Sequence, residues 1–272
     1  MATATIDFLD SSKLCNVFGA PSEGKMADTF LCALEWSDGT KTKAYAKCFS
    51  NARSRGLVNE ITGFLLAKSA HIPVPARAGL LEIPAAAFPG VDPINFYKYA
   101  FVISEAVGET LVSSYLIGDL RKHASLVDLV RNWTKLPEAL AFDDWVANVD
   151  RNQGNILIRG PDDVILIDHS NLPFALNWKA AMLDPSEASL NTLALIVHGS
   201  ATPTPSSVVL AMQNAAKDHI SAYNSVSTEL RYWWDQLLNN DKISRDALET
   251  FIEKRALNGN SRVVSQRGAK VA

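Results

Sequence analysis

Short apolar runs separated by turn residues fill the first hundred residues of the chain, and this pattern predicts a β-sheet. Each run is five to eight residues long, which is the ordinary length of a strand. Asp38 and Gly39 stand between the second and third runs, and an Asp-Gly pair favours a tight antiparallel hairpin. The predicted strands are residues 14–18, 29–36, 43–49, 77–83 and 99–104.

One helix is predicted between these strands, over residues 57–68. Its apolar residues recur every three or four positions, as they do on one face of an α-helix. The apolar stripe ends before the Ile72-Pro73 pair, and proline cannot continue a helix.

Beyond residue 110 the apolar pattern becomes mainly helical, with one exception. The short apolar runs 156–158 and 164–167 flank turn residues and predict a β-hairpin. Trp233 and Trp234 are predicted to be core residues. The predicted helices are residues 111–120, 125–133, 137–146, 190–197, 206–224, 228–238 and 244–257, an irregular segment covers 171–185, and residues 258–272 are predicted to be a frayed tail. The chain is therefore predicted to be a single α+β domain, with an antiparallel sheet first and helices after it.

Three oxygen-bearing side chains surround the predicted hairpin. Asp150 lies five residues before Asn155, which opens the first strand, and Asp168 follows the second strand. In protein kinases an Asp accepts the proton of the substrate hydroxyl, an Asn five residues later binds Mg²⁺, and a second Asp beyond a hairpin binds it too. Asp and Asn are also common turn residues, so taken alone this spacing fits turn chemistry equally well.

A lysine and a glutamate earlier in the sequence favour the kinase interpretation over ordinary turn chemistry. Lys47 lies in the third predicted strand, and Glu60 lies on the predicted helix thirteen residues later. A kinase-type ATP site needs a strand lysine for the phosphates and a helix glutamate to hold it. Because both residues occur in the required order before Asp150, Asn155 and Asp168, we interpret the five residues as one phosphoryl-transfer site, with Asp150, Lys47 and Glu60 catalytic and Asn155 and Asp168 binding metal.

Two further segments are candidates for binding the nucleotide. Residues 19–25 contain Gly19, Ser22, Gly24 and Lys25 and follow the first predicted strand, so their backbone could cover phosphates. The loop does not have the G-x-G-x-x-G pattern, and an ordinary surface hairpin would explain it nearly as well. Residues 104–108 follow the last predicted strand, and their backbone could meet an adenine edge. Glu105 and Val107 are the candidate residues there.

Three passages resemble a known family. They are Asn59-Glu60 followed by Ile72-Pro73-Val74-Pro75, then Asn148-Val149-Asp150-Arg151 with Asn155, then Ile167-Asp168-His169. Together they resemble the HipA-like branch of the protein-kinase-like superfamily, whose catalytic loop is similar to that of phosphatidylinositol kinases. The resemblance covers about residues 14 to 175.

The resemblance implies a bilobal kinase fold that uses ATP and Mg²⁺. An amino-terminal lobe would span about residues 1–105, a carboxy-terminal lobe about 108–257, and a tail 258–272. The resemblance also implies serine or threonine of a protein as the acceptor and allows a regulatory partner protein. It makes Ser22 the candidate for self-phosphorylation, while an ordinary exposed loop serine is the alternative and fits better. The chain departs from the family pattern at Asn152, where histidine is common, and at Ser170, where glycine is usual.

Composition and charge limit the partners. The net charge of −3 offers no electrostatic attraction to nucleic acid or to anionic membranes. The sequence has no run of eighteen apolar residues and no secretory signal pattern, which predicts a cytoplasmic protein without membrane insertion. The three cysteines, Cys15, Cys32 and Cys48, are predicted to be buried free thiols. His169 is open to two interpretations, a role in the site or structural hydrogen bonding.

Three other functions fit the same residues. One is a small-molecule or phosphoinositide kinase, the second is a transferase that binds ATP inverted and moves AMP, and the third is a pseudokinase that acts as a binding module. Fold-level analogy does not decide among acceptors.

Overall fold

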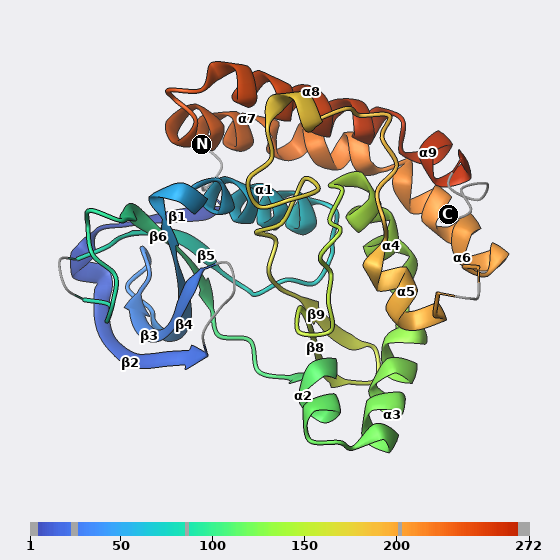
Figure 1. Cartoon of the computed structure of the whole chain (residues 1–272), viewed down its shortest axis with the longest axis horizontal. Helices are drawn as coiled ribbons and strands as arrows, with labels where there is room; N and C mark the ends of the chain where they lie inside the picture. Colours follow the sequence, from blue (N-terminus) through green and yellow to red (C-terminus); the bar gives the residue numbers. More distant parts are fainter. Residues whose placement is uncertain (1–4, 23–26, 85–86, 201–202, 266–272) are drawn as a thin grey trace.

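The computed structural model describes residues 5–22, 27–84, 87–200 and 203–265 of the chain. It is an α+β structure with a six-stranded sheet at the left of Figure 1, a three-stranded sheet at the lower centre, and helices above, to the right of and below the small sheet. The strands are β1 (Ile6–Leu9), β2 (Leu14–Ser22), β3 (Asp28–Glu35), β4 (Lys41–Ser50), β5 (Ala78–Glu82), β6 (Phe96–Ser104), β7 (Glu109–Thr110), β8 (Ile156–Gly160) and β9 (Asp163–Leu166). The helices are α1 (Arg55–Ser69), α2 (Leu111–Leu116), α3 (Leu120–Arg131), α4 (Leu136–Trp145), α5 (Thr192–His198), α6 (Ser206–Ala216), α7 (His219–Leu237), α8 (Lys242–Leu257) and α9 (Gly259–Ser265).

The large sheet is mixed, so the prediction of a purely antiparallel sheet is wrong. Its strand order is β1-β5-β6-β4-β3-β2, and β1 pairs with β5 in parallel, while the other neighbours are antiparallel. Strand β1 was not predicted, because four residues with only Ile6 and Leu9 buried carry too little periodicity. The backbone N–H groups of Thr5 and Ile6 also donate to the carboxylate of Glu229 on α7, which fixes this edge of the sheet to a late helix.

Strand β2 continues to Ser22, four residues beyond its predicted end at residue 18. Gly19 has a φ of +119°, which a glycine adopts without a steric penalty, and the pairing with β3 is irregular on both sides of it. The strand therefore bends at Gly19 and does not end there. Gly24 and Lys25 lie outside the described residues.

Helix α1 separates the large sheet from the carboxy-terminal helices and is buried around nearly its whole circumference, since every residue from Gly56 to Ala67 is buried (Figure 1). It packs on α7, where the indole of Trp234 donates to Oγ1 of Thr62 at 2.8 Å. At its amino end Arg55 forms an ion pair with Asp241 at 2.6 Å. A helix that is enclosed in this way is positioned by tertiary packing from both sides.

The carboxyl end of α1 is a Schellman motif. His71 has a left-handed φ of +57°, its N–H donates to the Lys68 carbonyl, and the N–H of Ile72 donates to the Ala67 carbonyl. The predicted helix end before Ile72-Pro73 is therefore confirmed to within a few residues.

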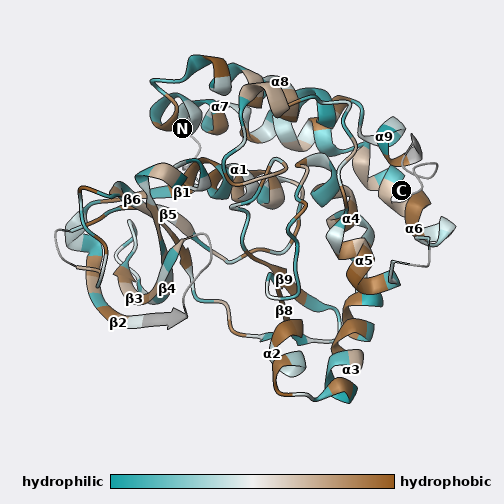
Figure 2. Cartoon of the chain, viewed as in Figure 1, coloured by the Kyte–Doolittle hydropathy of each residue, from teal (hydrophilic) through white to brown (hydrophobic). Residues whose placement is uncertain are grey.

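The small sheet has the order β7-β8-β9 and contains the predicted hairpin. Strands β8 and β9 pair in register from Ile156 opposite Leu166, and all apolar residues of both strands are buried. The chain reaches this sheet from β6 through residues 105–108, which have no regular structure. Beyond it, the exposed apolar residues Leu116, Ile117 and Leu120 lie around the end of α2, which is hydrophobic in Figure 2.

The carboxy-terminal helices differ from the predicted ones in three places. The predicted break between residues 224 and 228 does not exist, because α7 runs unbroken from His219 to Leu237. The helical structure is instead interrupted at Lys217 and Asp218, between α6 and α7. Residues 259–265, predicted as frayed, form helix α9, whose Val263 is buried. Trp233 and Trp234 are buried, as predicted.

The described helices include none that is long and apolar enough to cross a membrane.

Candidate functional site

Lys47, Glu60 and Asp168 meet, although they come from β4, α1 and the segment after β9. The ammonium nitrogen of Lys47 lies 2.5 Å from Oε1 of Glu60 and 3.1 Å from Oδ1 of Asp168. The second oxygen of Glu60 accepts from the backbone N–H of His169 at 3.1 Å. Glu60 therefore connects helix α1 to the lysine and to the residue that follows Asp168.

Burial and the attraction between opposite charges have opposing effects on the pKa values in this cluster. Burial alone would lower the pKa of Lys47, but the charges of Asp168 and Glu60 outweigh it and raise this pKa to about 12. Burial works against ionisation of Asp168, yet Lys47 and the Ser170 hydroxyl hold its pKa well below the usual range. For Glu60, burial is the larger effect and raises the pKa to about 7. The ammonium of Lys47 and the carboxylate of Asp168 are thus both charged at neutral pH.

Asp168 is held by the strand that precedes it and by the turn that follows. The N–H of Ile167 donates to the Asn155 carbonyl at 3.1 Å, so the two ends of the hairpin stay together. Asp168 itself has a left-handed φ of +61°. Its Oδ1 accepts from the N–H and the hydroxyl of Ser170, at 3.2 and 2.8 Å. Ser170 therefore stabilises this turn by a side-chain hydrogen bond.

Asp150 and Asn155 are joined by the loop before β8. The amide nitrogen of Asn155 donates to the Asp150 carbonyl at 2.9 Å, which turns the amide oxygen away from that contact. The N–H of Asp150 donates to Oδ1 of Asn148 at 3.2 Å. The Asp150 carboxylate in turn accepts at Oδ2 from the amide of Asn171, at 2.6 Å. The predicted site residues of this loop are thus connected by hydrogen bonds within one compact turn.

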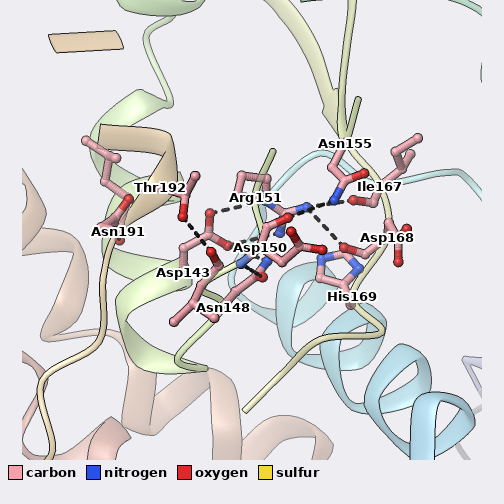
Figure 3. A network of polar contacts seen from close by, with 12 residues as sticks. Asp143, Asn148, Asp150, Arg151, Asn155, Ile167, Asp168, His169, Asn191 and Thr192 are labelled. Carbon is pink, nitrogen blue, oxygen red and sulfur yellow. Dashed lines mark hydrogen bonds and ion pairs between the residues drawn. The ribbon is translucent and has the colours of Figure 1, made fainter. Parts of the chain in front are cut away.

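A buried ion pair underlies this loop (Figure 3). The guanidinium of Arg151 donates twice to Asp143 on α4, at 3.0 and 3.1 Å, and both side chains are fully enclosed. A third nitrogen donates to the Ile167 carbonyl at 2.6 Å. Burial is the main influence on Asp143 and raises its pKa despite the pairing. Arg151 therefore fastens the Asp150 loop to the backbone just before Asp168.

The sequence reasoning missed Asp143, Asn171 and the role of Arg151. The signal for Asp143 was a charged residue inside an apolar helical run, which is rarely buried without a partner. Asn171 had no signal of its own, because its contact with Asp150 depends on how the following segment folds back.

Besides Lys47, the predicted nucleotide-binding residues that the structure describes lie on β2 and on the segment after β6, and Ser22 is two strands away from Lys47 because Thr29 pairs with both. Gly19 lies within β2, and Ser22 ends that strand opposite Thr29. The N–H of Glu105 donates to the Lys43 carbonyl at 3.0 Å, and Val107 is 73% exposed. Residues 105–108 thus run beside the start of β4, the strand that carries Lys47.

His169 is buried beside Gly63 and Phe142, and Nε2 of its ring has no hydrogen-bond partner among the described residues. Burial lowers its pKa well below the ordinary value, so the ring is neutral. The ring packs between α1 and α4, while the backbone N–H of His169 donates to the carboxylate of Glu60.

The prediction of buried free thiols holds for Cys32 and Cys48 and is wrong for Cys15. Cys15 is exposed because β2 is an edge strand of the large sheet. Burial raises the pKa of Cys32 to about 12, so this thiol is inert as a nucleophile.

A magnesium ion has a limited but suitable set of donors here. The described residues contain no group of three or more His, Cys, Asp or Glu side chains that could hold a metal. Mg²⁺ needs fewer, because it binds one or two carboxylates, keeps several waters and uses substrate phosphates. Lys47 and Ser170 contact Oδ1 of Asp168, the amide nitrogen of Asn155 donates to Asp150, and about a third of the Asp168 side chain is exposed. The candidate ligands are therefore Oδ2 of Asp168 and the amide oxygen of Asn155. These two oxygens fit the role.

No protein-family model matches the chain, and no curated protein sequence matches it.

Proposed function

We propose that the chain is an ATP- and Mg²⁺-dependent phosphotransferase of HipA-like type, with a bilobal protein-kinase-like fold, that phosphorylates serine or threonine of a protein. The observation that carries the proposal is the contact of Lys47 with both Glu60 and Asp168. These residues lie far apart in the sequence, and the kinase reaction needs this lysine, helix glutamate and metal-binding aspartate together.

The proposed division of roles follows from charge and exposure. Lys47, kept cationic by two carboxylates, neutralises the α and β phosphates of ATP. Asn155 and Asp168 hold Mg²⁺, which neutralises the charge that develops on the phosphate oxygens when it is bound. Asp150 is partly exposed and accepts the hydrogen bond of the acceptor hydroxyl.

In the transfer step the acceptor oxygen forms a bond to the γ phosphorus as the bond to the β–γ bridging oxygen breaks. The hydroxyl proton passes to Asp150 and ADP leaves. In the bilobal arrangement that we propose, residues 105–108 connect the two lobes, and ATP lies between the large sheet and the Asp150 loop.

The experiment compares γ-labelled with α-labelled ATP in the presence of Mg²⁺ and a host lysate. Label from the γ position on protein serine or threonine supports the proposal. Label on a lipid or small molecule would indicate a different acceptor, label from the α position an AMP transferase, and binding of ATP without any labelling a binding module. Asp168→Asn serves as the inactive variant. Asp163→Asn, which removes an exposed carboxylate of β9 that pairs with Arg159, serves as the matched control.

A further inference from the structure

The two oxygens of the Asp150 carboxylate are held unequally. Oδ2 accepts from Nδ2 of Asn171 at 2.6 Å, a length typical of a strong hydrogen bond to a charged oxygen. Oδ1 has a single contact among the described residues, with Nδ2 of Asn152 at 3.4 Å, which is near the limit for a hydrogen bond. Oδ1 is therefore the oxygen that remains available to a hydroxyl group.

Asn171 reaches Asp150 because the segment that follows Asp168 folds back over the loop. The N–H of Phe174 donates to the Ala147 carbonyl at 2.9 Å, and the N–H of Leu172 donates to the His169 carbonyl. These bonds hold the backbone after Asn171, and the amide of Asn59 on α1 donates to the carbonyl of Ser170 just before it at 2.6 Å. The amide is thus presented from a chain segment other than the one that carries Asp150.

Asn152 is positioned from its own loop. Its Oδ1 accepts from the N–H of Gly154 at 2.8 Å, which points the amide nitrogen toward Asp150. Asn152 is exposed, whereas Asn171 is half-buried. The shorter contact and the lower exposure both make Asn171 the stronger constraint on Asp150.

We infer that Asn171 is a positioning residue of this site: its amide fixes Oδ2 of Asp150, so that Oδ1 faces the acceptor hydroxyl. The inference rests on the proposed function, since it assigns a task to the residue proposed to receive the proton. A carboxylate on a short side chain rotates about its terminal bond, and a single strong hydrogen bond to one oxygen removes that freedom.

The test uses Asn171→Ala, which removes the donor, and Asn171→Asp, which keeps the size but replaces the donor with a second carboxylate. Asn177→Ala is the matched control, because Asn177 belongs to the same segment and donates to the Ala52 carbonyl, away from the site. The reaction measured is release of inorganic phosphate from MgATP, in which water replaces the acceptor and no acceptor need be known. The affinity for MgATP is measured by calorimetry on the same variants.

We expect kcat to fall about ten- to a hundredfold in Asn171→Ala, and at least as far in Asn171→Asp, with MgATP affinity changed less than about twofold. Asn177→Ala should match the parent. A kcat of Asn171→Ala within about twofold of the parent, or a parallel loss of MgATP affinity, would overturn the inference.

A second measurement does not depend on turnover. In crystal structures, the Asp150 carboxylate should occupy one conformer in the parent and rotate or split into several in Asn171→Ala. An unchanged single conformer in the variant would overturn the inference. If the parent binds MgATP and releases no phosphate to any acceptor, the proposed function fails, and the conformer of Asp150 still decides whether Asn171 positions it.

Discussion

Gly63 of helix α1 faces His169 so closely that a Cβ at position 63 would stand 2.3 Å from the Cβ of His169. The helix that carries Glu60 and the turn that carries Asp168 can approach each other only because position 63 has no side chain. This contact sets the spacing of the Lys47, Glu60 and Asp168 cluster.

We expect Gly63→Ala to destabilise the protein by about 1–3 kcal/mol through overpacking, although alanine is the better helix former by about 1 kcal/mol. Urea denaturation measures the change, and MgATP affinity should fall with it because Glu60 and Asp168 are forced apart. Gly160→Ala is the control, since a Cβ there would meet nothing within 4 Å. Equal stability of both variants would contradict the packing argument.

Asp150→Asn is expected to separate binding from transfer. The substitution keeps the shape of the side chain and removes the proton acceptor, so transfer should fall at least about a hundredfold while MgATP affinity stays within about twofold. Single-turnover assays and calorimetry measure the two quantities. A matching loss of both would mean that Asp150 supports the loop and not the acceptor.

The sequence predicts the positions of Lys47 and Glu60 but not the role of Gly63. Lys47 and Glu60 were placed on a strand and on the following helix because their neighbours have clear periods of two and of three to four residues. Position 63 had no such signal: a glycine inside a helical run is unfavourable, and only the approach of residue 169 explains it.

Long-range contacts also account for the other differences. The amide of Asn171 reaches Asp150 by a backfolded segment, and the parallel strand β1 depends on pairing with β5, more than sixty residues away. The predicted break in α7 was placed at a polar stretch around Ser225 and Ser227. The helix continues there because it packs against α1 and α8, and the hydroxyls of both serines donate to main-chain carbonyls three residues earlier without ending it.

Arg151→Ala should be one of the most destabilising single substitutions in the chain. It leaves the buried Asp143 carboxylate without a charged partner, a change that costs about 3–5 kcal/mol. Arg159→Ala breaks the exposed pair with Asp163 and should cost less than about 1 kcal/mol. Chemical denaturation of the two variants compares them directly, and similar losses would mean that the Arg151 pair is not effectively buried.

His219 should make the protein sensitive to acid. Burial and the nearby Arg262 lower its pKa from 6.5 to about 3, and its ring stacks on Trp145 at 4.5 Å. Below pH 6.5 the unfolded chain binds a proton at this residue while the folded chain does not, so stability is lost as the pH falls from 6.5 toward 3. Between pH 7 and pH 5 the loss from this residue is about 2 kcal/mol.

His219→Phe keeps an aromatic ring against Trp145 and removes the titrating group. The difference in unfolding free energy between pH 7 and pH 5 should therefore shrink by about 2 kcal/mol in this variant. Parallel stability curves for the parent and His219→Phe would exclude His219 as the cause.

Helix α1 is enclosed partly by a segment that is synthesised much later. The helix emerges from the ribosome long before α7, yet α7 covers one of its sides, and Glu229 of α7 also holds the backbone of the first strand. During synthesis, the apolar surface of α1 that α7 covers stays exposed until about residue 237 has been added. The first half of this polypeptide therefore does not bury all of its own apolar surface, and the last helices supply the rest of the core.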